Sequence, residues 1–294
     1  MPHPDTAEPA TALLTETAFA KINIALHVRA RRADGYHELD SLFAFAEHGD
    51  VLRGVARGDD VIALTIDGPF GAGLDAGEGN LVVRAARALA AWDGGIRGAD
   101  LHLTKNLPVA SGIGGGSADA AAALRLLIRL WDIAPAPDAL HDLALALGSD
   151  VPACLASATL RVGGRGDQLA PAAIDGLAGA PILLVNPRIP VATGPVFAQW
   201  DGQDRGALDA SSLKALVARG RNDLEPPAMR LAPMIGDVLA QLRGRAGVRL
   251  ARMSGSGATC FALFDDDAGR DAAGRALAAT HPHWWTMATR IRDL

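Results

Sequence analysis

The stretch Pro108-Val109-Ala110-Ser111-Gly112-Ile113-Gly114-Gly115-Gly116-Ser117 leads directly into a periodic apolar segment. Apolar residues recur there at the spacing of one helix face, namely Ala120, Ala123, Leu124, Leu127, Ile128 and Trp131. Glycines let backbone N–H groups converge, and a helix N-terminus adds unpaired donors and positive potential. The stretch therefore predicts a phosphate-binding loop, in which Ser117 caps the helix or contacts phosphate or Mg²⁺. A purely structural tight turn is the alternative.

Two other phosphate-binding motifs are excluded. The chain contains no Gly-Lys pair, so a Walker A loop is absent. The Gly-x-Gly-x-x-Gly spacing of dinucleotide binders is not met, because Ser117 stands where the third glycine belongs. The catalytic and metal-binding triplets of protein kinases are also missing.

Strands and helices are mixed along the chain. Residues 19–28 alternate, which predicts a half-buried strand with Ile22 and Ile24 on one face and Lys21, Asn23 and His27 on the other. Further strands are expected at 38–45, 61–66, 101–105, 181–185 and 286–291, and 253–264 is expected to form either a strand pair or a strand with a turn. Helices are expected after the cap Asn80, at 120–131, 137–147, 211–219, 222–242 and 267–279. Because strict βαβ alternation is absent, we expect an α+β fold.

The bulk composition is that of a globular protein. With 294 residues, of which 49% are hydrophobic, two domains are expected, 1–163 and 164–294, divided at the glycine-rich segment 163–166. The net charge of −5 gives no general attraction for nucleic acid or anionic lipid. Neither a basic targeting segment nor a membrane-spanning stretch is apparent, and the two cysteines have no metal-ligand spacing. We expect a cytoplasmic protein with neither a nucleic-acid nor a membrane partner.

Lysine is rare in this chain. Lys21, Lys105 and Lys214 are the only three, and every other strongly basic residue is arginine. Genomic composition is the favoured explanation of the bias. In a chain that otherwise uses arginine, a lysine can nevertheless indicate a position that requires a compact ammonium group. Lys21 and Lys105 are therefore candidate functional residues.

Three separated segments resemble the signature motifs of the GHMP kinases: 20–23 (Ala-Lys-Ile-Asn), 108–122, and 252–258 (Arg-Met-Ser-Gly-Ser-Gly-Ala). The resemblance spans nearly the whole chain. It implies an N-terminal domain of ribosomal-S5-domain-2-like topology and a ferredoxin-like C-terminal domain. It also implies that ATP, with Mg²⁺, and a small-molecule substrate meet in the cleft between them.

Two further strings are more specific than the glycine loop. Arg32-Ala33-Asp34-Gly35-Tyr36-His37-Glu38-Leu39 and Asn222-Asp223-Leu224-Glu225 are similar to strings of GHMP kinases that phosphorylate a cytidine-diphosphate-linked sugar alcohol. The reaction implied is a step of non-mevalonate isoprenoid synthesis. A GHMP kinase for another alcohol, such as homoserine or a mevalonate derivative, is the nearest alternative. A nucleotide-binding relative that has lost catalysis is the second.

The resemblance also assigns site residues. Lys21 and Asp150 match the catalytic pair, and a carboxylate beside an ammonium suits proton acceptance during phosphoryl transfer. Substrate-binding residues are expected to be Asn23, Tyr36, His37, Lys105 and Phe197, with cytosine between the rings of Tyr36 and Phe197. ATP-binding residues are expected to be Pro108, Val109, Ala110, Ser111, Gly112, Ile113, Gly114, Gly115, Gly116, Ser117 and Ala118. The alternatives are a surface carboxylate for Asp150, a solvated strand lysine for Lys21 and a core role for Phe197.

The chain departs from the family pattern in the loop. Where two consecutive serines are common, it has Ser117-Ala118, so one hydroxyl is absent and Ser111 or backbone donors are expected to replace it. No carboxylate lies in the loop before Ser117, which leaves the Mg²⁺ ligands unidentified. The turn 254–257 is either a β-bulge or a set of N–H donors at the phosphate end of the site. The sequence leaves monomer and homodimer both open.

Overall fold

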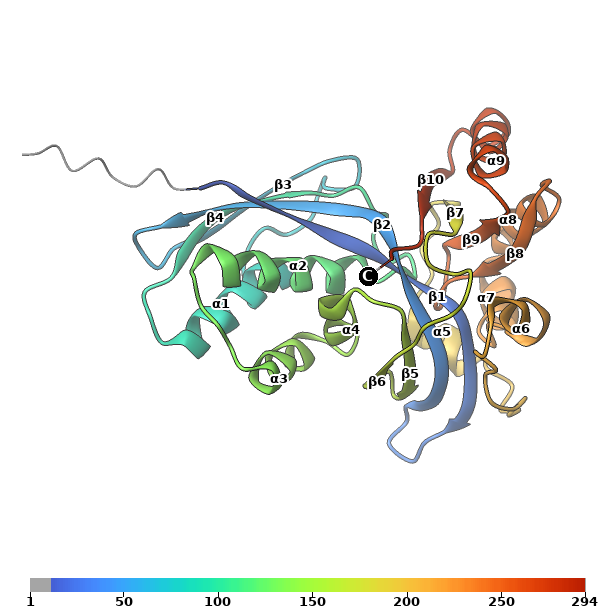
Figure 1. Ribbon diagram of the computed structural model, residues 1–294, viewed down its shortest axis with the longest axis horizontal. Coiled ribbons are helices and arrows are strands. Elements are labelled where there is room, and N and C mark those ends of the chain that lie inside the picture. Colours follow the sequence, from blue (N-terminus) through green and yellow to red (C-terminus); the bar gives the residue numbers. More distant parts are fainter. Residues whose placement is uncertain (1–11, 294) are drawn as a thin grey trace, which may run out of the picture.

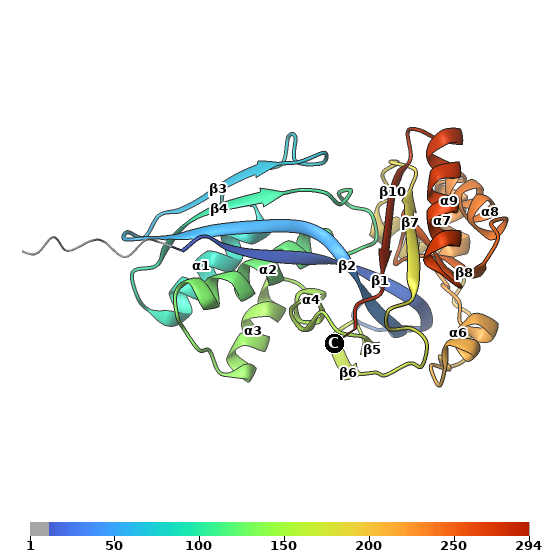
Figure 2. The same cartoon turned by 45° about the horizontal axis from the view of Figure 1, so that its top comes forward.

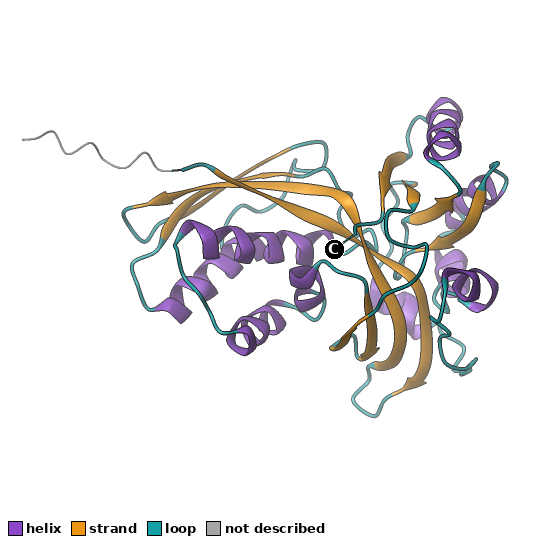
Figure 3. Cartoon of the chain, viewed as in Figure 1, coloured by secondary structure: helices purple, strands orange, loops and turns teal. Residues whose placement is uncertain are grey.

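The computed structural model describes residues 12–293, which form an α+β fold with two sheets (Figure 1). The larger sheet contains the strands β1 (Leu14–Arg31), β2 (His37–Arg57), β3 (Ile62–Asp67), β4 (Gly98–Thr104), β5 (Leu160–Gly164) and β6 (Gln168–Pro171). The smaller sheet contains β7 (Pro181–Asn186), β8 (Val248–Met253), β9 (Cys260–Phe264) and β10 (Trp285–Arg290). The mixture of helices and strands confirms the predicted fold class (Figure 3).

The larger sheet is organised around the long strand β2. Strand β1 pairs antiparallel with it over nearly its whole length, while β4 and β5 pair with its two ends. β3 runs parallel to β4, and β6 pairs antiparallel with β5. The hairpin of β1 and β2 therefore extends from one region of the molecule to the other, as Figure 1 shows.

The first strand is buried on both faces, so the prediction of a half-buried strand is wrong. Ile22 and Ile24 belong to the same apolar cluster as Leu184 and Phe261 of the smaller sheet. Lys21, on the opposite face, is only 5% exposed. The helices α2 (Gly115–Leu130) and α4 (Val151–Ala156) contact β1. Residues of the C-terminal region also bond to its edge, for example Arg221 O, which accepts from Leu26 N at 2.8 Å. These contacts are remote in sequence, and alternation alone does not reveal them.

Four helices of the described chain lie against one face of the larger sheet: α1 (Leu81–Asp93), α2 (Gly115–Leu130), α3 (Pro137–Leu147) and α4 (Val151–Ala156) (Figure 1). The predicted cap of α1 is confirmed, because Val82 N donates to Asn80 Oδ1 at 2.9 Å. Helix α2 starts within the glycine stretch, so Ser117 lies in its first turn. Its N-cap is Gly114, at a φ of 65°. The expectation that Ser117 caps this helix is therefore wrong.

The smaller sheet has the order β10-β7-β9-β8, and all its pairings are antiparallel. The helices of this region are α5 (Thr193–Ala198), α6 (Leu213–Arg219), α7 (Glu225–Leu231), α8 (Met234–Arg243) and α9 (Asp267–Thr280). Figure 2 shows α8 and α9 on the side of this sheet that faces away from the larger one. Of the two alternatives predicted for 253–264, the structure shows the strand with a turn, since β9 is the one strand that lies within this range and its partner β8 ends at Met253. The helix predicted at 267–279 is confirmed.

The single helix predicted at 222–242 is wrong. Residues 222–224 precede α7, and the helical path breaks at Ala232, where φ is −141° and ψ is 80°. Pro233 follows, and a proline disfavours the helical conformation of the residue before it. Helix α8 then starts in a new direction and buries Ile235 and Leu239.

The segment between the two predicted domains is a turn within the larger sheet. Residues 163 and 164 end β5, and β6 pairs back onto β5 after the turn. The two sheets nevertheless separate along the chain, since β7 is the first strand of the smaller one. The division into 1–163 and 164–294 stays a prediction.

Candidate active site

A cavity of about 520 Å³ lies where β1, the glycine loop, the start of α4 and the segment before α5 meet. Its walls contain Lys21, Asn23, Asp150 and Phe197, together with much of the predicted ATP-binding stretch, Ser117 included. These residues come from elements more than 170 positions apart in sequence, between Lys21 and Phe197. The fold brings them to one cleft, which we call the central cleft.

Lys21 and Asp150 form an ion pair in the central cleft. Lys21 Nζ donates to Asp150 Oδ2 at 3.0 Å. The lysine side chain is 7% exposed and the carboxylate 32%, so the carboxylate is the partner open to a reactant. The Phe43 ring lies 4.2 Å from the ammonium and adds a cation–π contact. This pair places a carboxylate oxygen that can accept a proton beside a fixed cation.

The glycine loop is bound to β1 and to the 254–257 turn through its backbone. Lys21 N donates to Ile113 O at 3.0 Å, and Ser254 Oγ donates to Gly112 O at 3.0 Å. A Cβ on Gly112 would lie 2.5 Å from Ser254 O, and its φ of 78° is left-handed. Gly112 is therefore required by both space and conformation. Ser254 is thus a support of the loop.

The N-terminus of α2 points its first turn at the central cleft. Gly114 provides no side-chain cap, so the first N–H groups of the helix have no partner from the cap residue. Gly114, Gly115, Gly116 and Ser117 all line the cavity, as do Ala110, Ser111 and Gly112. Unpaired N–H groups and the helix dipole make this end of α2 suited to bind phosphate.

The remaining residues of the predicted ATP-binding stretch lie elsewhere. Ile113 and Ala118 are buried in apolar clusters, and neither Pro108 nor Val109 lines the central cleft.

The hydroxyl of Ser111 donates to Pro108 O at 2.6 Å. That donor is therefore already used within the loop.

Lys105 lies beneath the first turn of α2 and does not line the central cleft. Its Nζ is 2.5 Å from Asp50 Oδ2 and 2.5 Å from Asp119 Oδ2, and all three side chains are buried. Burial alone lowers the pKa of Lys105, but Asp119 and Asp50 outweigh it and the pKa is raised. Burial raises the pKa of Asp119 to about 7, against the opposing effect of Lys105. The structure thus places Lys105 in a buried ion cluster that joins α2 to the larger sheet.

A second cavity, of about 550 Å³, adjoins the central cleft and contains the predicted cytosine-binding residues Tyr36, His37 and Phe197. We call it the aromatic cavity. The rings of His37 and Phe197 lie 5.0 Å apart, centre to centre, and Tyr36 is 58% exposed. Burial, and to a lesser degree Arg31, lowers the pKa of His37, which favours the neutral imidazole. His37 Nε2 has no hydrogen-bond partner among residues 12–293.

Asn23 combines a structural bond with an unused acceptor. Its Nδ2 donates to Ser41 Oγ at 3.0 Å, while its Oδ1 has no partner within the described part of the chain. Because Asn23 lines the central cleft and is 2% exposed, this oxygen can receive a donor from a small molecule without a competing protein contact.

Several lining residues were not predicted from the sequence. Arg165 lines both cavities and lies 5.1 Å from the centre of the Tyr36 ring. Trp200 lines neither cavity but packs edge-on against His37, with 5.7 Å between the ring centres. Thr193 and Ser256 line the central cleft and bond to each other at 2.9 Å. The only sequence signal for Arg165 was its position between two glycines, and Thr193 carried none.

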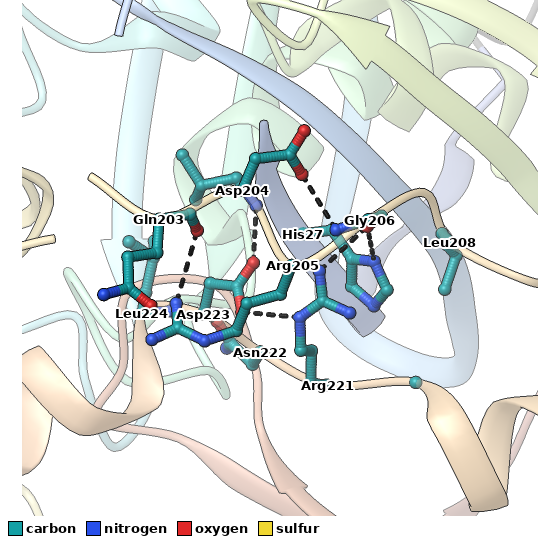
Figure 4. A network of polar contacts seen from close by, with 12 residues as sticks. His27, Gln203, Asp204, Arg205, Gly206, Leu208, Arg221, Asn222, Asp223 and Leu224 are labelled. Carbon is teal, nitrogen blue, oxygen red and sulfur yellow. Dashed lines mark hydrogen bonds and ion pairs between the residues drawn. The ribbon is translucent and has the colours of Figure 1, made fainter. Parts of the chain in front are cut away.

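Residues 222–225 support the site through hydrogen bonds to neighbouring segments. Asn222 Nδ2 donates to Met253 O and Gly255 O, each at 2.8 Å, and so holds the 254–257 turn. Asp223 accepts from Val28 N and from Arg221 Nε, and Arg221 also donates to Gly206 O (Figure 4). Residues 222–225 therefore fix both β1 and the turn that supports the glycine loop.

Metal-ligating side chains are sparse in the described chain. Within residues 12–293, no group of three or more His, Cys, Asp or Glu side chains is placed to hold a metal ion. Mg²⁺ in phosphoryl-transfer sites is commonly held by one or two carboxylates together with phosphates and water. Asp150 and Ser117 supply two oxygen ligands in the central cleft, so the residues present fit such an ion. None of the described helices is long and apolar enough to cross a membrane.

Two families of protein domain match this chain. The family of GHMP kinases N terminal domains matches residues 80–158, and the family of GHMP kinases C terminal domains matches residues 206–283. The 4-diphosphocytidyl-2-C-methyl-D-erythritol kinase of Rhizorhabdus wittichii is 55% identical over 280 residues, with 95% of this chain and 94% of the relative covered. The kinase of the same name from Sphingopyxis alaskensis is 52% identical, with 96% and 100% covered.

Solved structures agree with these relatives. A crystal structure of 4-(cytidine 5'-diphospho)-2C-methyl-D-erythritol kinase superposes with a TM-score of 0.80 at 33% identity, covering 96% of this chain and 100% of that one. Homoserine kinase from Cytophaga hutchinsonii has a TM-score of 0.74 at 17% identity, with 97% and 96% covered, and shows the shared fold alone. The chain belongs to the GHMP kinases and, within them, to the family of 4-diphosphocytidyl-2-C-methyl-D-erythritol kinases.

Proposed function

We propose that this protein transfers the γ-phosphoryl group of ATP to the 2-hydroxyl of 4-diphosphocytidyl-2-C-methyl-D-erythritol. The observation that carries the proposal is the Lys21–Asp150 pair, 3.0 Å apart, at one end of the central cleft. The phosphate-binding end of α2 lines the same cleft, and the aromatic cavity opens beside it. The start of α2 thus suits the phosphates of ATP, Asp150 suits the attacking hydroxyl, and the aromatic cavity suits the cytosine.

Phosphoryl transfer of this kind requires no covalent bond between the protein and the substrate. Phosphoryl transfer proceeds through a loose transition state, so positioning and charge stabilisation provide most of the catalysis. Asp150 accepts the proton of the attacking hydroxyl, and Lys21 orients that carboxylate. The N–H groups of Gly115 and Gly116 hold phosphate oxygens. Mg²⁺, when bound with ATP beside Asp150 and Ser117, would neutralise phosphate charge.

Substrate recognition is assigned to the aromatic cavity. Tyr36 and Phe197 stack on cytosine, and the buried ring of His37 bonds to its edge. A base stacked on an aromatic ring contributes about 1–3 kcal/mol. This selects the cytidine-linked alcohol over homoserine or a mevalonate derivative, neither of which carries a base.

ADP release coupled to a chromogenic reaction tests the proposal. We expect turnover with the cytidine-diphosphate-linked alcohol and little or none with the same alcohol lacking cytidine, with homoserine or with mevalonate. Turnover with homoserine or mevalonate alone would transfer the function to the alternative GHMP activity. No turnover with any alcohol, despite ATP binding, would favour a nucleotide-binding protein without catalysis. A cytoplasmic location and a monomeric or homodimeric state remain predictions.

A further inference from the structure

Arg165 lies where the two cavities join. The central cleft and the aromatic cavity share a set of lining residues of which only one is charged, namely Leu39, Ser149, Arg165, Thr193 and Phe197. The other cations lie to either side. Lys21 lines only the central cleft, where Asp150 holds it, and Arg31 lines only the aromatic cavity.

We propose that Arg165 binds the diphosphate of the substrate, so that the site selects a nucleoside diphosphate over a nucleoside. This inference rests on the proposed function, because that function fixes the two ends of the substrate. With the base in the aromatic cavity and the acceptor hydroxyl at Asp150, the diphosphate that links them must pass the junction. A guanidinium presents paired N–H donors that match phosphate oxygens, and such charge-assisted bonds are about twice as strong as neutral ones.

The guanidinium of Arg165 is free to take this role. Its residue sits in the turn between β5 and β6, flanked by Gly164 and Gly166 with φ of 62° and 100°. The turn is fixed by a backbone bond, from Arg165 N to Asp167 Oδ1 at 3.0 Å. Within residues 12–293 the one ion pair of this side chain is with Asp167, at 3.5 Å, and the Arg165 side chain is 46% exposed. An exposed pair of this kind stabilises little, so a diphosphate can replace it.

The position of Tyr36 connects diphosphate and base binding. The guanidinium of Arg165 lies 5.1 Å from the centre of the Tyr36 ring, within reach of a cation–π contact. One side chain can therefore rest against the ring that stacks on the base and contact the phosphates next to that base. We infer that Arg165 sets the spacing between the cytosine and the reacting hydroxyl.

Calorimetric titration of the full chain with cytidine and with cytidine diphosphate, at physiological salt, tests the inference. Arg165→Gln should weaken binding of the diphosphate by about 10- to 100-fold and change cytidine binding by no more than about twofold. Arg165→Lys should recover part of the loss, because the charge stays and the paired donors go. Arg31→Gln is the matched control, since Arg31 lines the aromatic cavity but not the central cleft, and it should weaken diphosphate binding less than Arg165→Gln does. In steady state, Arg165→Gln should raise KM for the cytidine-diphosphate-linked alcohol more than it lowers kcat.

If Arg165→Gln weakens the binding of cytidine and of cytidine diphosphate equally, Arg165 supports the Tyr36 ring and does not bind the phosphates. That result would overturn the inference. Unchanged binding of the diphosphate would overturn it as well. These results leave the proposed function standing if the wild type still phosphorylates the cytidine-diphosphate-linked alcohol. A wild type that neither binds cytidine diphosphate nor uses that alcohol would overturn the proposed function, and the inference with it.

Discussion

Two of the three lysines of this chain form ion pairs with carboxylates, one pair partly exposed and the other buried. Lys21 has one carboxylate partner, Asp150, which is 32% exposed and lines the central cleft. Lys105 has two, Asp50 and Asp119, and the side chains of all three are at most 7% exposed. The first pair has an oxygen open to a reactant, whereas the second cluster is closed. We take this difference to separate the pair proposed for catalysis from a cluster that supports the start of α2.

This contrast bears on the prediction that Lys105 binds substrate. That role remains a prediction, but the burial of the ammonium favours a support role instead. A Cβ on Gly115 would lie 3.2 Å from Lys105 Nζ, so the cluster lies directly below the N-terminus of α2. Through Asp119 it fixes the start of that helix to the larger sheet.

The largest effect is expected at the exposed pair. Lys21→Ala and Asp150→Asn should each lower kcat by about 10²- to 10⁴-fold, because proton acceptance and its electrostatic support are lost. Stability should change little, since the pair is partly solvated. Steady-state kinetics with thermal unfolding alongside measures both. Lys214→Ala, which removes the exposed third lysine on α6, is the control and should leave both unchanged. Wild-type kcat in either variant would show that the catalytic roles are misassigned.

The buried cluster should respond in the opposite way. Lys105→Met leaves Asp50 and Asp119 buried without a cation, and we expect a loss of about 3–5 kcal/mol in the free energy of unfolding. Urea denaturation measures the loss. Adding Asp119→Asn to this variant should restore part of it by removing one of the two carboxylates. If Lys105→Met unfolds like the wild type but has lost activity, the comparison between the two lysines fails.

The sequence predicted local features of this molecule well. The cap at Asn80, the helix at 137–147 and the glycine stretch ending in a helix each depend on neighbouring residues, and the structure confirms them. The two-sided burial of β1 was missed because the contacts that bury it come from Leu184, Phe261 and other distant residues.

The site was predicted only in part, again because some of its contacts join residues that are distant in sequence. Lys21, Asn23, Asp150 and Phe197 meet in one cleft, but no local pattern places Arg165 beside Tyr36. That proximity arises because the turn between β5 and β6 lies next to the start of β2, through pairing of Leu39 with Gly164. The break before Pro233 was in contrast readable from the sequence, since proline restricts the residue that precedes it.

A smaller effect is expected in the aromatic cavity, where binding and chemistry separate. Tyr36→Ala should weaken substrate binding by about 1–3 kcal/mol, because one stacking surface is lost. The loss should appear in KM, with kcat nearly unchanged, unlike the effect of changing Asp150. Steady-state kinetics with the cytidine-diphosphate-linked alcohol decides this. A fall in kcat alone would place Tyr36 nearer to the reaction than to the base.

The last effect, spread over several pH units, concerns the pH dependence of stability. Burial raises the pKa of Asp119 to about 7, whereas an unfolded aspartate titrates near pH 4. Between these values the folded chain keeps a proton that the unfolded chain releases, so the free energy of unfolding should fall as pH rises, by at most about 1.4 kcal/mol per unit. Asp119→Asn has no such proton, and its urea midpoints should vary less with pH in this window. Parallel pH profiles for variant and wild type would contradict the proposed titration.

The most direct test is to follow the transferred phosphate by ³¹P nuclear magnetic resonance in a mixture of ATP, Mg²⁺, the cytidine-diphosphate-linked alcohol and the wild-type chain. We predict that a phosphomonoester signal on the 2-hydroxyl grows together with that of ADP, and that Asp150→Asn, folded as the wild type, produces neither at a comparable rate. ATP hydrolysis to inorganic phosphate without the phosphomonoester, or an undiminished rate in Asp150→Asn, would contradict the role of the exposed lysine–carboxylate pair.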